Sequence, residues 1–163
     1  MELRPVRADD APLFEAELCD PAMMEHLGGP ISLEKAHATL ARQLDPADAE
    51  RTWAFVIVTG AGEDAGSVCL WSHEEADLGP ISELGWMVLP AFQGRGLGRG
   101  AVAELLERAR VDGRWGAVHA YPAVSNDASN AMCRTLGFEL VETIDIEYSG
   151  RTLRCHHWRL DPA

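Results

Sequence analysis

The chain has 163 residues, of which 47% are hydrophobic and 25% are charged, a composition typical of a soluble globular domain. It carries 14 Lys and Arg against 26 Asp and Glu, and the resulting net charge of −12 argues against nonspecific binding to nucleic acid or to an anionic membrane. No apolar run approaches the length that spans a bilayer, and the N-terminus lacks the hydrophobic region of a signal peptide. We therefore expect one domain over residues 1–163, located in the cytoplasm, with neither nucleic acid nor a membrane as partner.

The spacing of the cysteines, at positions 19, 69, 133 and 155, fits neither a zinc site nor a disulfide framework. His156 and His157 are adjacent, so on a strand they would point to opposite faces and would form a poor metal clip. The sequence therefore predicts no metal and a reducing compartment.

The first half of the chain predicts one strand, two helices and a hairpin. In order, these are a strand over residues 2–7, a helix from Asp9-Asp10 to about residue 19, a loop over residues 20–31, a helix over residues 32–44, and strands over residues 51–59 and 67–72. Asp9-Asp10 is expected to cap the first helix, since Asp side chains accept hydrogen bonds from free N–H groups there. Residues 73–80 are acidic and rich in turn formers, which indicates a connection.

The second half alternates strands and helices before a final hairpin. The expected elements are strands over residues 81–89 and 115–121, a helix ending near residue 112, a helix from Asn126 to Gly137, and strands over residues 138–148 and 151–160. Gly137 is placed as the residue that ends its helix in the left-handed conformation. The order of elements predicts an α/β (α+β) fold with one mixed, mostly antiparallel sheet of about six to seven strands and helices on both faces.

The stretch from Gln93 to Gly100, QGRGLGRG, has the features of an anion site. It follows an apolar strand and opens a helix, where unpaired backbone N–H groups and the helix dipole attract negative charge. Its alternating glycines let an anion approach the backbone, and Arg95 and Arg99 can supply charge-assisted hydrogen bonds. Phosphate is the usual ligand of such a turn.

Three ligand-binding motifs compete for this stretch. A Walker A loop fails because no Lys and Ser or Thr follow the glycines. A dinucleotide fingerprint matches at Gly96, Gly98 and Ala101, but residues 117–119 lack the acid that this fingerprint requires. The third pattern, Q-x-x-G-x-G from Gln93, resembles the pyrophosphate loop of the GNAT superfamily of acyl-CoA N-acyltransferases. A glycine-rich turn without a ligand is the remaining alternative.

A second motif strengthens this resemblance. The family pattern N-x-x-[AS]…L-G-F is matched by Asn126, Ser129 and the run from Leu136 to Phe138. The opening residues 3–10 and the serine at position 129 are most similar to the branch that contains the ribosomal-protein N-terminal acetyltransferases. Two motifs in the correct order, together with the order of elements, extend the resemblance over most of the chain.

The resemblance implies acetyl-CoA as co-substrate and two central strands that splay apart to admit its pantetheine arm as a missing strand. It also implies a set of residues that bind the co-substrate: Met87, Val88, Gln93, Gly94, Arg95, Gly96, Leu97, Gly98, Arg99, Asn126 and Ser129. For Asn126, a simple helix cap is the structural alternative.

Acetyl transfer to an amine needs a base for the ammonium ion and an acid for the thiolate that leaves. Glu83 matches the position of the family's catalytic glutamate, and a solvated acid at a strand end is its alternative. Cys133 stands where the family often has a tyrosine, so it is either the acid or inert packing. Tyr121 and a water molecule are rival acids, and the backbone N–H of Val88 is a candidate to hold the oxyanion.

His119 and Tyr121 share one face of their strand and would line the acceptor site if that face borders the splay; an outer-face pair is the alternative. The expected activity is transfer of an acetyl group from acetyl-CoA to a primary amine, on a peptide N-terminus or a small molecule, by direct attack in a ternary complex. A non-catalytic acyl-CoA-binding module and a nucleotide-binding oxidoreductase are the other hypotheses. The sequence leaves open the acceptor, the acyl-chain preference and a homodimer through the terminal strands.

Overall fold

The computed structural model describes residues 1–75, 78–148 and 150–161. Its centre is a seven-stranded sheet in the order β1-β2-β3-β4-β5-β7-β6, antiparallel except for the β4–β5 pair. The strands are β1 (Glu2–Pro5), β2 (Thr52–Val58), β3 (Asp64–Glu75), β4 (Gly79–Val88), β5 (Val118–Ala120), β6 (Glu139–Tyr148) and β7 (Arg151–Leu160).

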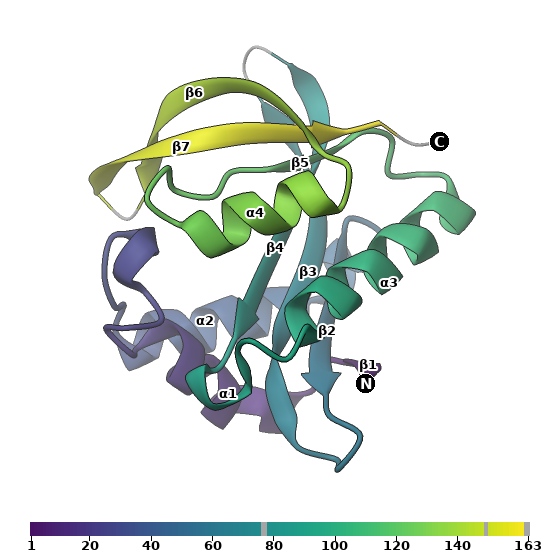
Figure 1. Ribbon diagram of the computed structural model, residues 1–163. Helices are drawn as coiled ribbons and strands as arrows, with labels where there is room; N and C mark the ends of the chain where they lie inside the picture. The colour runs from purple at the N-terminus through teal and green to yellow at the C-terminus, as the bar shows by residue number, and fades with distance from the viewer. Residues whose placement is uncertain (76–77, 149, 162–163) are drawn as a thin grey trace.

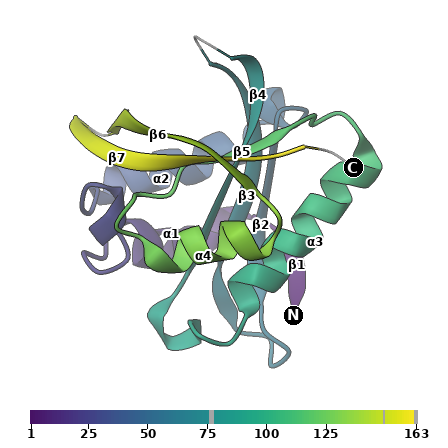
Figure 2. The same ribbon diagram turned by 45° about the horizontal axis from the view of Figure 1, so that its top comes forward.

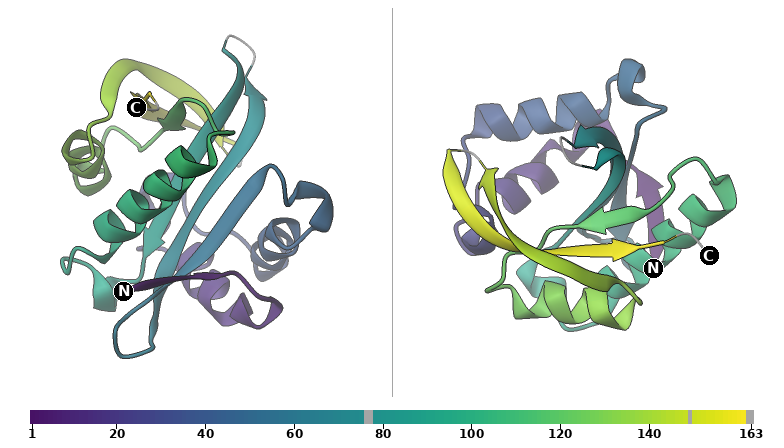
Figure 3. Two further views of the ribbon diagram at one scale, coloured as in Figure 1. Left: turned by 90° about the vertical axis from the view of Figure 1, so that its right-hand side faces the viewer. Right: turned by 90° about the horizontal axis from the view of Figure 1, so that it is seen from above.

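Helices cover both faces of the sheet. They are α1 (Ala11–Leu18), α2 (Leu33–Gln43), α3 (Leu97–Asp112) and α4 (Asp127–Thr135). Figures 1 and 3 show α3 and α4 on one face and α1 and α2 on the other. Short 3-10 turns lie at Ala8–Asp10, Glu25–Leu27, Pro46–Asp48 and Pro90–Phe92. Among the described residues, no helix is long and apolar enough to cross a membrane.

Two hydrophobic clusters hold these layers together. Buried residues under α3 and α4 include Leu84, Val102 and Trp158, whereas Phe14, Leu40 and Val56 belong to the cluster under α1 and α2. Side chains alternate between the two faces of a strand, so both clusters draw on the central strands. The predicted fold class, with one mixed sheet and helices on both faces, is confirmed.

The hairpin of β3 and β4 is longer than the sequence indicated. His73 pairs with Ile81 and Glu75 pairs with Gly79, so the predicted connection over residues 73–80 is wrong for most of its length. Residues 76 and 77 of the predicted connection lie outside the described residues. Polar composition suggested a loop, but pairing with a long partner strand overrides that local preference.

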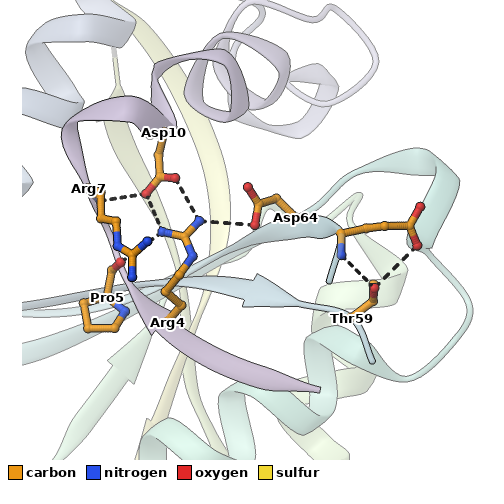
Figure 4. A network of polar contacts seen from close by, with 7 residues as sticks. Arg4, Pro5, Arg7, Asp10, Thr59 and Asp64 are labelled. Carbon is orange, nitrogen blue, oxygen red and sulfur yellow. Dashed lines mark hydrogen bonds and ion pairs between the residues drawn. The ribbon is translucent and has the colours of Figure 1, made fainter. Parts of the chain in front are cut away.

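The Asp10 side chain, which was expected to cap the first helix, makes other contacts instead. Asp10 occupies the N-cap position of α1, yet its side chain makes no capping bond there. Its carboxylate instead accepts two hydrogen bonds from the Arg4 guanidinium, at 2.8 and 3.1 Å, and one from the N–H of Arg7 at 2.6 Å. Figure 4 shows this network, in which Arg4 also reaches Asp64 at 3.2 Å. Asp10 therefore ties the start of α1 to Arg4 on β1, and Arg4 extends the network to Asp64 on β3.

Candidate functional site

Strands β4 and β5 separate soon after they meet. Their parallel pairing consists of Ser82 with Val118 and Glu83 with His119. Beyond β5 the chain stays with β7, since the N–H of His156 donates to Pro122 O at 3.0 Å and the N–H of Val124 donates to Arg154 O at 2.9 Å. β4 meanwhile continues along β3 to Val88, as Figure 1 shows. Within the described part of the chain, the second half of β4 thus has one edge without a partner strand, which makes the expected splay.

The free edge of β4 presents backbone groups to this gap. The N–H of Leu89 donates to Ala65 O on the β3 side at 2.9 Å. Backbone groups alternate in direction along a strand, so those of Val88 point away from β3 and into the gap, whereas those of Met87 point toward β3. The Gln93 side chain donates to Val88 O at 2.8 Å and so fixes the end of β4 against the following loop. Of the two residues predicted to pair with a pantetheine arm, Val88 has the required orientation.

The glycine-rich loop forms a cradle of free donors at the end of this gap. Gly94 and Gly96 have φ of 73° and 75°, a conformation that favours glycine. Among the described residues, no hydrogen bond is made by the backbone N–H groups of residues 94 to 99. A Cβ at Gly98 would meet the Val88 side chain at 3.1 Å, so this glycine allows α3 to start close to β4.

The glycine-rich loop also carries positive charge. The guanidinium of Arg95 lies over the Phe92 ring at 5.5 Å, at the mouth of the loop. α3, with 16 residues, directs the positive end of its dipole toward the same place. The loop therefore suits a pyrophosphate, because its amides, helix dipole and arginines all favour negative charge.

The second motif forms the start of α4, on the other side of the gap. Asn126 is the N-cap of α4, and its side-chain oxygen accepts from the N–H of Ser129 at 3.0 Å. Figure 2 shows α4 lying alongside β6 and β7, and the Trp158 indole of β7 donates to Asn130 on this helix at 2.9 Å. Gly137 has φ of 86° and ends the helix as expected.

Glu83 lies at the point where β4 and β5 part. Its carboxylate is 2.9 Å from His73 Nε2 on β3. Burial raises the pKa of Glu83, and the contact with His73 opposes this shift without cancelling it. A carboxylate with a raised pKa is a better proton acceptor than a solvated one.

Aromatic rings lie on the same face of the sheet as this carboxylate. Gly85 follows on the same face of β4, and a Cβ there would meet the Trp71 indole at 3.2 Å, so the missing side chain makes room for that ring. Tyr121 stacks on His157 with ring centroids 4.7 Å apart, and His119 lies 5.0 Å from the same ring. Burial and the nearby Glu83 raise the pKa of Tyr121 to about 12. The structure therefore brings Glu83, His119 and Tyr121 together on one face of the sheet.

Cys133 lies apart from this group. It is fully buried in the cluster under α3 and α4, where burial raises the pKa of its thiol to about 12. Its side chain is one of the core contacts of α4, and the group around Glu83 occupies the opposite face of the sheet. The remaining predicted residues thus fall into three sets: the cradle with the free edge of β4, the start of α4 with Asn126 and Ser129, and the cluster around Glu83.

Comparison with known proteins agrees with this arrangement. The sequence model of the acetyltransferase (GNAT) domain matches residues 1–139. The chain belongs to the GNAT acetyltransferase family. The predicted family and enzyme class are therefore confirmed. No curated protein matches this GNAT chain in sequence.

Solved structures share the fold along the whole chain. The acetyltransferase that modifies the N-terminal serine of ribosomal protein L7/L12 from Salmonella typhimurium is 19% identical with a TM-score of 0.81, covering 98% of this chain and 93% of that one. Spermidine N-acetyltransferase from Vibrio cholerae, in complex with CoA and spermine, is 16% identical with a TM-score of 0.80, covering 99% and 95%. Ribosomal-protein-alanine N-acetyltransferase from Brucella melitensis is 24% identical with a TM-score of 0.78, covering 99% of each chain.

Two histidines of this GNAT site were missed by the sequence analysis. His73 was assigned to a connection, although it belongs to β3 and contacts Glu83. His157 was considered only as a metal ligand, although it contacts both His119 and Tyr121. The alternation of β7 did place His156 and His157 on opposite faces. A correct register for the two hairpins was the signal needed to bring either histidine to the site.

Proposed function

We propose that this chain transfers an acetyl group from acetyl-CoA to a primary amine by direct attack in a ternary complex. The observation that carries this proposal is the free edge of β4 that ends in a cradle of unpaired N–H groups, with Glu83 at the other end of the edge. That arrangement suits a long co-substrate with an anionic end and a reactive end. The acetyl group would arrive as a thioester.

The residues of the cradle would hold the pyrophosphate of the co-substrate. The backbone N–H groups of residues 94–99 supply donors, and Arg95 and Arg99 supply positive charge in a chain whose net charge is −12. Along β4, the backbone groups of Val88 face the gap and would pair with an amide of the pantetheine arm. Of these two groups, the C=O of Val88 would pair with the amide, and its N–H would hold the oxyanion that develops on the acetyl carbonyl.

Glu83 would bind the acceptor as an ammonium ion and take its proton. An amine attacks only as the neutral form, so a base beside it is needed at neutral pH. The pKa of Glu83 is raised by burial, which makes this carboxylate a stronger base than a solvated glutamate. Tyr121 and His119 would line the acceptor site beside it.

Direct attack is favoured over a covalent acyl-enzyme because the buried thiols stay protonated. Burial, with Glu17 and Glu83 nearby, raises the pKa of the Cys69 thiol to about 12, and burial does the same for Cys133. The thiolate is the nucleophilic form of cysteine, so neither side chain is activated for acyl transfer at neutral pH.

Ligand-induced stabilisation tests the co-substrate. Thermal unfolding is measured with acetyl-CoA, with CoA and with NAD at matched concentrations. A ligand at 100 times its dissociation constant adds about 2.7 kcal/mol to the free energy of unfolding, which raises Tm visibly. Stabilisation by both CoA species and not by NAD is expected; stabilisation by NAD alone would support the dinucleotide alternative instead.

Turnover is then measured as release of CoA thiol across a panel of amines. Two enzymes that share the fold act on a protein N-terminus and on spermidine. The panel therefore contains peptides with free N-termini, spermidine and amino acids. The burial of Cys133 favours one alternative, a module that binds acyl-CoA without turnover, because the position where the family often has a tyrosine carries no accessible acid. Binding of acetyl-CoA with no thiol release from any amine would support that module.

A further inference from the structure

We propose that His73 is the positioning residue of Glu83: it holds one oxygen of the carboxylate, so that the other oxygen is free to take the proton of the acceptor. The inference rests on the proposed acetyl transfer, since it concerns the base of that reaction. His73 acts through Glu83 and is not itself the base.

The contact between the two side chains follows from the register of the β3–β4 hairpin. Trp71 pairs directly with Glu83, and His73 is two residues further along β3, so His73 and Glu83 are diagonal neighbours on one face of the sheet. His73 Nε2 lies 2.9 Å from Glu83 Oε2, and the side chains are 33% and 24% exposed. Among the described residues, no other side chain forms a hydrogen bond with this carboxylate.

This hydrogen bond has one possible direction when Glu83 is ionised. A carboxylate only accepts, whereas a neutral imidazole has one N–H donor and one acceptor nitrogen. The carboxylate therefore selects the neutral tautomer with the proton on His73 Nε2, and the imidazolium form carries a proton there as well. His73 thus donates to Glu83 Oε2 in either form.

The second oxygen of the carboxylate is free. Among the described residues, Glu83 Oε1 accepts no hydrogen bond. It is also not sealed in the interior, since the buried side-chain atoms without a partner in the described chain are Glu17 Oε1 and Trp115 Nε1. One oxygen of Glu83 is therefore held by the protein, and the other is open to an incoming ammonium ion.

The backbone of Glu83 is already fixed without His73. It pairs with Trp71 on one side and with His119 on the other. From the opposite face, the Ser82 hydroxyl donates to Trp115 O at 2.5 Å and holds the same part of β4. The side chain still has its own rotamer freedom, and a base must lie within hydrogen-bond reach of the proton that it takes. His73 supplies the contact that sets the orientation of this side chain.

The His73 ring is flanked by a second ring. The Trp71 indole lies 6.5 Å away between centroids, with the two planes inclined at 20°. Because Gly85 has no side chain, this indole can lie over β4 beside the carboxylate. A ring without a donor at position 73 would keep this packing and lose the hydrogen bond to Glu83.

The donor also changes the proton affinity of Glu83. Burial raises the pKa of Glu83, the hydrogen bond and charge of His73 lower it, and Glu75 raises it. The titratable groups that face Glu83 come from three strands and the residue after β5: Cys69, His73 and Glu75 of β3, His119 of β5 with Tyr121 after it, and Cys155 of β7. Without the donor, burial and Glu75 would raise the pKa of Glu83 further.

Spectroscopy tests the positioning without turnover. In the whole chain, 13C spectra of the Glu83 carboxyl, assigned by Glu83→Gln, report its pKa, and two-bond 1H–15N spectra report the tautomer of His73. We expect His73 protonated at Nε2, and a pKa of Glu83 that rises in His73→Phe and returns toward the wild-type value in His73→Gln. A neutral His73 protonated at Nδ1, or an unchanged pKa of Glu83 in His73→Phe, would overturn the inference.

Kinetics test what the contact does. His73→Phe keeps a ring beside Trp71 and removes the donor, whereas His73→Gln keeps an N–H donor without the ring. His73→Phe is expected to lower kcat by about 10- to 100-fold, as for loss of a hydrogen bond to a charged group, and to move the rise of the rate to higher pH. KM for acetyl-CoA should not change, because the cradle lies at the other end of β4. His73→Gln should recover most of the rate and of the pH profile.

A second histidine–carboxylate pair provides the matched control. His37 Nε2 on α2 lies 2.6 Å from Glu15 Oε1 on α1, with side chains 51% and 40% exposed. His37→Phe should keep the wild-type rate and pH profile, and stabilisation of each variant by CoA shows that it is folded. A His73→Phe variant with the wild-type rate and profile, or a His73→Gln variant as impaired as His73→Phe, would overturn the positioning role alone. Absence of turnover in the wild type would overturn the proposed function, and the spectra would still decide whether His73 holds Glu83.

Discussion

Asp10 and Glu17 lie seven residues apart, are 5% and 1% exposed, and sit in opposite electrostatic environments. The guanidinium of Arg4 and the N–H of Arg7 oppose the cost of burial and hold the pKa of Asp10 below its usual value. In the described part of the chain, Glu17 Oε2 accepts from the Ser67 hydroxyl at 2.8 Å, and Glu17 Oε1 has no partner. Burial therefore raises the pKa of Glu17 to about 8. Two carboxyls of similarly low exposure thus differ in charge, because Glu17 lies deeper and has no cation beside it.

The two regions differ in whether the charges of their buried acids are balanced by neighbouring groups. The Arg4–Asp10–Asp64 network of Figure 4 joins β1, α1 and β3, and its groups are mutually satisfied. Glu17 and Glu83 face the side of β3 and β4 where the acceptor is proposed to bind, and the pKa of each is raised by burial. A site that must bind a cation or move a proton keeps acids whose charge the protein alone does not balance. We therefore expect the first region to contribute to stability and the second to contribute to the proposed chemistry.

Glu83→Gln is expected to have the largest effect. Loss of a general base lowers kcat by about 100- to 10,000-fold, or roughly 3–5 kcal/mol of transition-state stabilisation. Since the pKa of Glu83 is raised, the wild-type rate should rise with pH as the carboxylate forms, and the variant should lose this rise. The rate is measured as thiol release against pH, with Glu74→Gln as the control because Glu74 is exposed on the same hairpin. A variant with wild-type turnover and an unchanged profile would remove Glu83 as the base.

Glu17→Met is expected to change the pH dependence of stability. A carboxyl with a raised pKa binds more protons in the folded state, so its contribution to stability is full below its usual value of 4.5 and is lost as the pH rises toward 8. Over pH 5 to 8, wild-type stability should fall by about 3 kcal/mol relative to the variant. Urea unfolding at pH 5, 6.5 and 8 measures this difference. Parallel curves for the two proteins would show that Glu17 is ionised in the folded state.

The sequence predicted those parts of the site that depend on local backbone rules. Gly137 has the positive φ expected of it, and Gly94 and Gly96 also have positive φ, a conformation that glycine adopts without a steric penalty. Asn126 caps its helix, which was the structural alternative to its predicted contact with the co-substrate. Such requirements are satisfied within a few residues, so the two motifs and the order of elements follow from the sequence.

The positions of His73, His157 and Asp10 depend on long-range contacts that local sequence patterns do not predict. His73 reaches Glu83, and His157 reaches His119, only through the register of two hairpins whose strands are ten residues or longer. Asp10 was expected to cap α1 because Asp prefers that position, and a partner on β1 overrode the preference. Long-range pairing of charges was therefore the part that local patterns left open.

Asp10→Ala is expected to cost about 2–3 kcal/mol of stability at neutral pH. The substitution removes two charge-assisted hydrogen bonds and leaves the Arg4 guanidinium, 17% exposed, without its main counterion. A carboxyl with a lowered pKa contributes stability above its usual value of 3.8, and this is lost as the pH falls further, so wild type and variant should converge in acid. Asp9→Ala is the control, since Asp9 is exposed and makes no side-chain hydrogen bond among the described residues.

Asp64→Asn is expected to have the smallest effect, although Asp64 contacts the same guanidinium. Its side chain is 44% exposed and its distance to Arg4 is 3.2 Å, so water screens the pair and each ion is solvated when the other is neutralised. The loss should be below about 0.5 kcal/mol at 0.15 M salt. A double-mutant cycle with Asp10→Asn measures the coupling between the two carboxylates through Arg4. A loss for Asp64→Asn as large as that for Asp10→Ala would mean that exposure does not separate the two carboxylates, and that the network binds its arginine as one unit.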